Sequence, residues 1–283
     1  MPNTSIKIFL ILPLAFLYGI LPHPLPLFAQ QTISHSYLLE YYGENGEPEP
    51  VSSPADWYKR REQILEGMQL AMLALHPTGP LGKLIVAGKG PHENRQYGLE
   101  LAQRGYVVLC PDYPSFGDYE YDFENDGYIS GTLKGIFNHM RCVDQLESLA
   151  YVDPERIGLI DHSLGGHNAM FIGVFDQRLK VIVSSCGWTP FHHYYEGNIK
   201  GWTSPRYMPR LRDVYNLDPD LVPFDFYEVV GALAPRPFFS NSPLNDSNFN
   251  VEGVKLGINE AAKIYRLLDK EEALNIIEQN QIN

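Results

Sequence analysis

The stretch of residues 157–167 limits the possible folds of this chain more than any other segment. Residues 157–161 are mostly apolar and predict a buried strand, and residues 168–175 are typical of a helix. Ser163 lies on the tight turn between them, and Gly165 and Gly166 let the helix begin close to the strand. Such a serine is either an ordinary turn residue or the nucleophile of a nucleophile elbow, and the strand–turn–helix context favours the elbow. The backbone N–H of Leu164 would then point to where an oxyanion forms.

Strands and helices alternate along the rest of the chain. We expect strands over residues 71–75, 106–110, 157–161, 181–185, 238–241 and 274–278, and helices over 94–103, 132–149, 226–232 and 252–268. Residues 84–87 fit either a short strand or an ordered glycine-rich loop. The alternation predicts an α/β fold of three layers, in which a mainly parallel sheet carries helices on both faces.

One junction departs from this regular alternation. A helix begins at Ser53, with Pro54 in its first turn, and runs into the strand at 71–75 without any turn residue between them. A helix fused to a strand in this way is unusual. We therefore expect that connecting material is missing here and that the sheet is incomplete at its N-terminal strands.

Composition excludes some partners. The 22 Lys and Arg residues against 34 Asp and Glu give a net charge of −12, which argues against nucleic acid and anionic membrane surfaces. The three cysteines, Cys110, Cys142 and Cys186, show no metal-ligand spacing and are expected to be buried free thiols. We expect no metal and no cofactor.

The N-terminus has the features of a secretory signal. Lys7 is followed by an apolar run at 8–20, and Ala29 closes a plausible cleavage site. The alternative is a membrane anchor, but prolines at 13, 22, 24 and 26 interrupt the stretch, and a spanning helix needs about 20 apolar residues. We predict a signal peptide over 1–29, a single domain over 30–283, and a secreted or periplasmic protein with no membrane association after signal removal.

Two further loops at the carboxyl ends of predicted strands are candidates for the site. In residues 76–79 the backbone N–H of Thr78 or Gly79 could be a second oxyanion donor, since Pro77 has none; the alternative is a plain turn. Asp246 follows the strand at 238–241, where an acid that orients a histidine would lie, although a turn or cap aspartate is equally common there. Three other acids compete with it less favourably: Asp218, Asp220 and Asp225.

The segment 187–209 is rich in aromatic residues. Trp188, Trp202 and Tyr207 could form a wall over Ser163 that binds a sugar or aryl group, or they could simply pack a long loop. His192 and His193 are adjacent, with no carboxylate or cysteine at ligand spacing, so they give little support for a metal.

From about Ser53 to Glu278 the chain resembles a secreted branch of the α/β-hydrolase superfamily, related to acetyl-xylan esterases and dienelactone hydrolases. The matching stretches are residues 75–78, 104–107, 111–117, 162–168, 184–187, 201–207 and 243–249. The resemblance implies Ser163 as nucleophile, Asp246 as acid, and a small ester or an acetylated polysaccharide as substrate.

Three departures from the family pattern affect the expected activity. Asp161 stands where the family has glycine, and the family's early strands are not found before the 75–78 stretch. Family members also continue beyond the last strand with a histidine-bearing loop and a helix, whereas none of the nine histidines here follows Asp246. We therefore expect an esterase with impaired activity, or alternatively a non-catalytic remnant that binds a carbohydrate or a partner.

Overall fold

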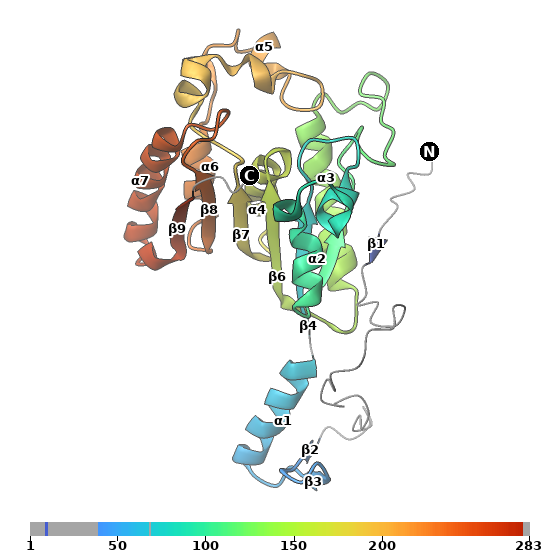
Figure 1. Ribbon diagram of the computed structural model, residues 1–283. Coiled ribbons are helices and arrows are strands. Elements are labelled where there is room, and N and C mark those ends of the chain that lie inside the picture. The colour runs from blue at the N-terminus through green and yellow to red at the C-terminus, as the bar shows by residue number, and fades with distance from the viewer. Residues whose placement is uncertain (1–8, 11–38, 68, 280–283) are drawn as a thin grey trace.

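The computed structural model describes residues 9–10, 39–67 and 69–279. A seven-stranded sheet runs in the order β1-β5-β4-β6-β7-β8-β9 (Figure 1). The strands are β1 (Phe9–Leu10), β4 (Gln69–Leu75), β5 (Val107–Cys110), β6 (Val152–His162), β7 (Leu179–Ser185), β8 (Phe238–Pro243) and β9 (Leu274–Gln279). All neighbouring pairs from β5 to β9 are parallel, and β1 pairs antiparallel with the outer edge of β5.

Helices cover both faces of the sheet, as the sequence predicts. They are α2 (Tyr97–Gln103), α3 (Gly131–Glu147), α4 (Leu164–Phe175), α6 (Phe226–Leu233) and α7 (Val251–Leu267), whereas the short α5 (Arg210–Asp213) lies above the sheet. Alternate residues of β4 face opposite sides: Leu73 and Leu75 join the large buried cluster that contains Val143 of α3, while Ala74 joins a smaller cluster with Ala102 of α2. The predicted three-layer α/β fold is confirmed.

The junction before the sheet is also as predicted, because α1 (Pro54–Gly67) ends one residue before β4 begins. Figure 1 shows α1 beside the hairpin of β2 (Glu40–Tyr42) and β3 (Pro48–Pro50), below the sheet and apart from the helices that cover it. The hydroxyl group of Tyr41 on this hairpin donates to Glu49 at 2.7 Å and to Asp56 of α1 at 3.4 Å. These contacts hold α1 against the hairpin.

Residues 84–87 do not form a strand. Ile85–Lys89 make a π-helical turn in which Gly88 has a φ of 81°, a conformation that favours glycine. The turn packs beside α2, and the side chain of Val86 is fully buried in the smaller cluster.

The order of the strands decides where a site can form. The chain leaves β4 toward β5 on one side and then crosses back to β6 on the other, so the loops after β4 and β6 diverge at a topological switch point. Leu75 is in register with Asp161, and His162 is in register with Ser185 of β7. The loops carrying Thr78, Ser163 and Asp246 therefore all lie at the carboxyl ends of the parallel strands.

The predicted buried free thiols are found at two of the three cysteines. Cys110 and Cys142 are buried free thiols, and Cys186 is a half-buried one. Most of the predicted signal peptide lies outside the described residues, apart from β1. In the described part of the chain, no helix combines the length and apolar character that crossing a membrane requires.

Candidate active site

Ser163 occupies a strained turn between β6 and α4. Its φ of 58° and ψ of −115° are unusual for a residue other than glycine, and its N–H donates to the carbonyl oxygen of Ser185 at 2.8 Å. A Cβ atom added at Gly166 would lie 2.8 Å from Cα of Gly187 and 3.0 Å from that same carbonyl oxygen. Glycine at 166 therefore lets α4 begin directly against β7. The serine side chain remains half-buried at the sheet edge.

The candidate oxyanion donors lie on either side of this turn. Leu164 is the first residue of α4, where backbone N–H groups have no partner within the helix. Its side chain is buried against Tyr113 and Phe116, which fixes the start of the helix. Thr78 is exposed in the loop after β4, and its hydroxyl group lies 3.2 Å from that of Tyr207.

Asp246 lies in the loop after β8. Its Oδ1 accepts backbone N–H groups from Asn248 at 2.8 Å and Phe249 at 3.1 Å, so the carboxylate is held in one orientation. It approaches Cys186 at the end of β7: burial, together with the charge of Asp246, raises the pKa of the Cys186 thiol to about 12. The loop thus brings this acid next to the strand that adjoins the elbow.

The three competing acids have other partners. Asp225 caps α6 and accepts the N–H of Phe191 at 3.0 Å. Asp218 caps a short 3₁₀ turn, and Asp220 pairs with His192 at 2.9 Å on the exposed surface. None of them is hydrogen-bonded to Ser163 within the described part of the chain.

Three histidines near the elbow are buried and engaged in packing. Nε2 of His76 accepts the N–H of Tyr113 at 2.9 Å, which leaves Nδ1 to donate to the carbonyl oxygen of Pro77 at 2.7 Å. His139 pairs with Asn168 at 2.9 Å, and His167 with Thr132 at 3.3 Å. Burial lowers the pKa of His76, and it lowers the pKa of both His139 and His167 to about 3, so all three are neutral at pH 7.

Two further histidines are also candidate bases, and neither is hydrogen-bonded to Ser163. His162 directs Nδ1 to the hydroxyl group of Ser185 at 3.1 Å, and burial lowers its pKa to about 4. His193 has a buried Nδ1 without a hydrogen-bond partner. Among the described histidines, no side chain forms a hydrogen bond with Ser163.

The three aromatic residues expected to bind substrate separate into two groups. Trp188 is 1% exposed and donates its indole N–H to Ser240 at 3.1 Å, and Trp202 is 5% exposed and stacks edge-on with His167. Both belong to the large core cluster, which is the packing alternative. Tyr207 is half-buried and packs on the Phe116–Leu164 cluster beside the elbow. It alone of the three lies next to a candidate catalytic group.

Asp161 is fully buried directly before the elbow. Its Oδ1 accepts from the Tyr97 hydroxyl group at 3.4 Å, whereas Oδ2 has no hydrogen-bond partner. Burial raises the pKa of this carboxyl group well above its ordinary value, so the neutral acid is the stable form.

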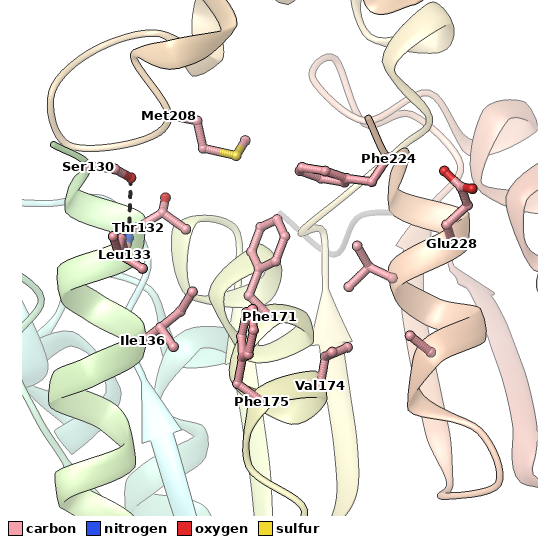
Figure 2. Close-up of a pocket in the computed structure, with 12 residues that line it drawn as sticks. Ser130, Thr132, Leu133, Ile136, Phe171, Val174, Phe175, Met208, Phe224 and Glu228 are labelled. Atoms are coloured by element: carbon pink, nitrogen blue, oxygen red, sulfur yellow. Dashed lines mark hydrogen bonds between the residues drawn. The ribbon is translucent and has the colours of Figure 1, made fainter. Parts of the chain in front are cut away.

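A groove that the sequence did not predict lies between α3, α4 and α6, with a volume of about 370 Å³ (Figure 2). Phe171 and Phe175 of α4 lie between Leu133 on α3 and Phe224 before α6, and the lining is almost entirely apolar. Phe171 is roughly two helical turns after Ser163, so this groove is separate from the serine site. In the described part of the chain, no group of three or more His, Cys, Asp or Glu side chains is arranged to hold a metal ion.

A serine on a strained strand-to-helix turn, at the switch point of a parallel sheet covered on both faces, defines an α/β-hydrolase. The chain belongs to the prolyl oligopeptidase family, whose model matches residues 94–256. The predicted α/β-hydrolase membership is thereby confirmed.

Known proteins of related sequence and structure agree with this class. The chain is 28% identical over 248 residues to YtaP of Bacillus subtilis, which is named as a hydrolase; the match covers 83% of this chain and 77% of YtaP. It is 23% identical over 203 residues to carbohydrate esterase MZ0003 of an unknown prokaryotic organism, covering 66% of this chain and 47% of that protein. A family 15 glucuronoyl esterase from Caldicellulosiruptor kristjansonii has the same fold, with a TM-score of 0.57, 15% identity, and coverage of 86% and 84%.

Proposed function

We propose that this chain is a serine carboxylester hydrolase, with Ser163 as nucleophile and an acetylated plant polysaccharide or a related small ester as substrate. The observation that carries the proposal is the strained backbone of Ser163 at the start of α4. Similarity to a protein named as a carbohydrate esterase supports the substrate class.

The reaction would proceed through an acyl-enzyme. The Ser163 hydroxyl oxygen attacks the ester carbonyl carbon as its proton passes to a base, which later returns it to the leaving alcohol, and the resulting oxyanion faces the N–H groups of Leu164 and Thr78. Collapse breaks the bond to the alcohol, which leaves with a proton, and water then hydrolyses the acyl-serine. Asp246 would orient the base of such a site, and no step requires a metal or a cofactor.

We propose further that base catalysis limits this chain. No histidine follows Asp246 in residues 1–283, and none of the described histidines is hydrogen-bonded to Ser163. Without a base, the serine hydroxyl group is a weak nucleophile. In a well-studied serine protease, loss of the histidine costs about a millionfold in turnover. The oxyanion hole and substrate binding would still leave roughly a thousandfold acceleration over water.

Labelling of Ser163 by a fluorophosphonate, followed by mass spectrometry, tests both parts. We expect slow labelling that is absent from Ser163→Ala, with hydrolysis of p-nitrophenyl acetate barely above background. Fast, Ser163-dependent turnover would contradict the lack of a base. Labelling equal to that of Ser163→Ala would contradict the esterase proposal itself.

The second candidate is a non-catalytic α/β-hydrolase that binds a carbohydrate. The buried carboxyl group of Asp161 beside the elbow, whose Oδ2 has no hydrogen-bond partner, favours it, since this position is glycine in the family pattern. Carbohydrate binding that is unchanged in Ser163→Ala, together with no labelling of Ser163, would support this candidate.

A further inference from the structure

Arg206 is fixed in place at the surface beside the elbow. Its guanidinium carbon lies 4.8 Å from the ring centre of Phe116, and its Nε donates to the hydroxyl group of Ser115 at 2.6 Å. Its backbone carbonyl oxygen accepts the hydroxyl group of Tyr113 at 2.6 Å, and Gly131 packs closely against that carbonyl. Both the backbone and the side chain of this exposed arginine are therefore held in one arrangement.

This arrangement connects Arg206 to the serine turn through a single aromatic layer. Phe116, on which the guanidinium group lies, belongs to the same buried cluster as Leu164, the residue after Ser163. Tyr207, the next residue in the chain, packs on this cluster and reaches Thr78 through its hydroxyl group. The guanidinium group thus lies at the rim of the site, and a single aromatic side chain separates it from each of the candidate oxyanion donors, Leu164 and Thr78.

The charge of Arg206 is not neutralised within the protein. An arginine has five N–H donors, and only Nε–H is used, so the four Nη–H donors remain available. No ion pair joins Arg206 to an acidic side chain in the described residues, although the protein as a whole carries a charge of −12. Such an arginine is prepared to bind an anion in two-point geometry.

A second arginine adds to the positive potential. Arg95 lies in a 3₁₀ turn before α2, and its charge contributes to the lowered pKa of His162 beside Ser163. Its side chain forms no ion pair in the described chain either. Arg206 and Arg95 lie on different loops around the elbow, so an anionic group arriving at the site meets positive charge within an acidic molecule.

We propose that Arg206 is a subsite for a carboxylate carried by a sugar unit near the ester, so that this protein prefers acidic over neutral saccharides. The Phe116 ring and Ser115 hold the guanidinium group, and its Nη–H donors pair with the two carboxylate oxygens. The preference rests on the proposed esterase function only for its location, because binding of an acidic saccharide requires no ester.

Isothermal titration of the full chain with two ligands tests the proposal. The ligands are a xylo-oligosaccharide bearing one glucuronate and the neutral xylo-oligosaccharide of equal chain length, neither of which carries an ester. We expect the acidic ligand to bind about tenfold more tightly at low salt, and the difference to shrink as salt is added. Since no ester is present, a negative result for esterase activity leaves this measurement intact.

Three variants isolate the guanidinium group. Arg206→Met keeps an aliphatic stem over Phe116 and should bind both ligands equally. Arg206→Lys keeps the charge without the two-point geometry and should retain a smaller preference. Arg210→Met removes an exposed arginine four positions further along and should leave the full preference. Thermal unfolding of each variant shows whether it is folded.

Three outcomes would overturn the assignment. The first is equal binding of the acidic and neutral ligands by the unmodified chain. The second is a loss in Arg210→Met as large as in Arg206→Met. The third is displacement of the acidic ligand by inorganic phosphate at equal concentration, which would indicate a general anion site rather than one for a sugar carboxylate.

Discussion

The carboxyl group of Asp161 occupies the space in which a side chain at Gly165 would lie. These residues stand two positions before and two positions after Ser163, so the acid and the glycine pack against each other under the nucleophile turn. The family pattern has glycine at both positions. Here one glycine is replaced by a buried acid whose Oδ2 has no partner, and the elbow accommodates it by keeping the acid neutral.

This relationship predicts a pH-dependent penalty on stability. Burial raises the pKa of Asp161 in the folded state. Above about pH 4 the Asp161 carboxyl group of the unfolded chain loses its proton, whereas that of the folded chain keeps it. The contribution of Asp161 to stability should therefore fall as pH rises, by at most about 1.4 kcal/mol per pH unit, until the folded pKa is reached. Urea unfolding of Asp161→Asn, which cannot ionise, should show a gain over the unmodified chain that is larger at pH 7 than at pH 4. A gain independent of pH would contradict the neutral acid.

Replacement of the same residue by the glycine of the family pattern tests the packing. Asp161→Gly removes a buried carboxyl group whose Oδ2 has no hydrogen-bond partner, and it should raise the midpoint of thermal unfolding at pH 7. A lower midpoint would show that the carboxyl group fills space that the elbow needs.

A buried ion pair supports the loop that holds Phe116. Lys83 is 1% exposed and pairs with Asp112 and, at 2.9 Å, with Asp118, so it ties the turn before α2 to both ends of the 112–118 loop. Lys83→Met would leave Asp112 buried without its charge partner, and we expect a loss of about 3–5 kcal/mol in the free energy of unfolding. Lys180→Met, which removes an exposed pair with Glu155, should lose less than about 1 kcal/mol. Urea denaturation at pH 7 measures both, and equal losses would show that the buried pair has no special role.

The regular pattern of the chain predicted much of this fold. Apolar runs located β5 to β9, and the helix expected over 168–175 forms the later part of α4, which begins four residues earlier at Leu164. The sequence left substrate binding and loop packing as alternatives for Trp188 and Trp202, because burial of an aromatic loop depends on distant partners such as Ser240 and His167. The same holds for the π-helical turn at 85–89 and for the apolar groove, which exists only where three helices that are separated in sequence meet.

The predicted signal peptide overlaps β1, and this gives a prediction about the exported protein. N-terminal sequencing of exported protein should begin near Gln30, and a start at Met1 would contradict cleavage.

Removal of residues 1–29 would also remove β1 (Phe9–Leu10), which pairs with β5, and would leave Val107–Cys110 as an open sheet edge. Such edges promote association, so light scattering should show more aggregation for the chain from Gln30 than for the full chain. Equal scattering by the two would contradict a protective role of β1.

The last prediction tests the proposal that Ser163 lacks a base. Oδ1 of Asp246 accepts the N–H groups of Asn248 and Phe249, the Cys186 thiol also hydrogen-bonds to this carboxyl group, and we expect the acid to orient an imidazole ring at the position of the catalytic base. If Ser163 lacks only a base, imidazole added to the solution should take that position, oriented by Asp246, and accelerate fluorophosphonate labelling of Ser163. General-base catalysis contributes typically 10²–10⁴-fold, and a base that is not attached to the chain should reach only the lower part of that range.

Mass spectrometry of the labelled serine separates this acceleration from hydrolysis of the fluorophosphonate in solution. Asp246→Ala should lose most of the acceleration, and Ser163→Ala should show no label. Labelling that is fast without imidazole, or unchanged by it, would mean that another group already accepts the Ser163 proton or that the turn does not present a reactive serine.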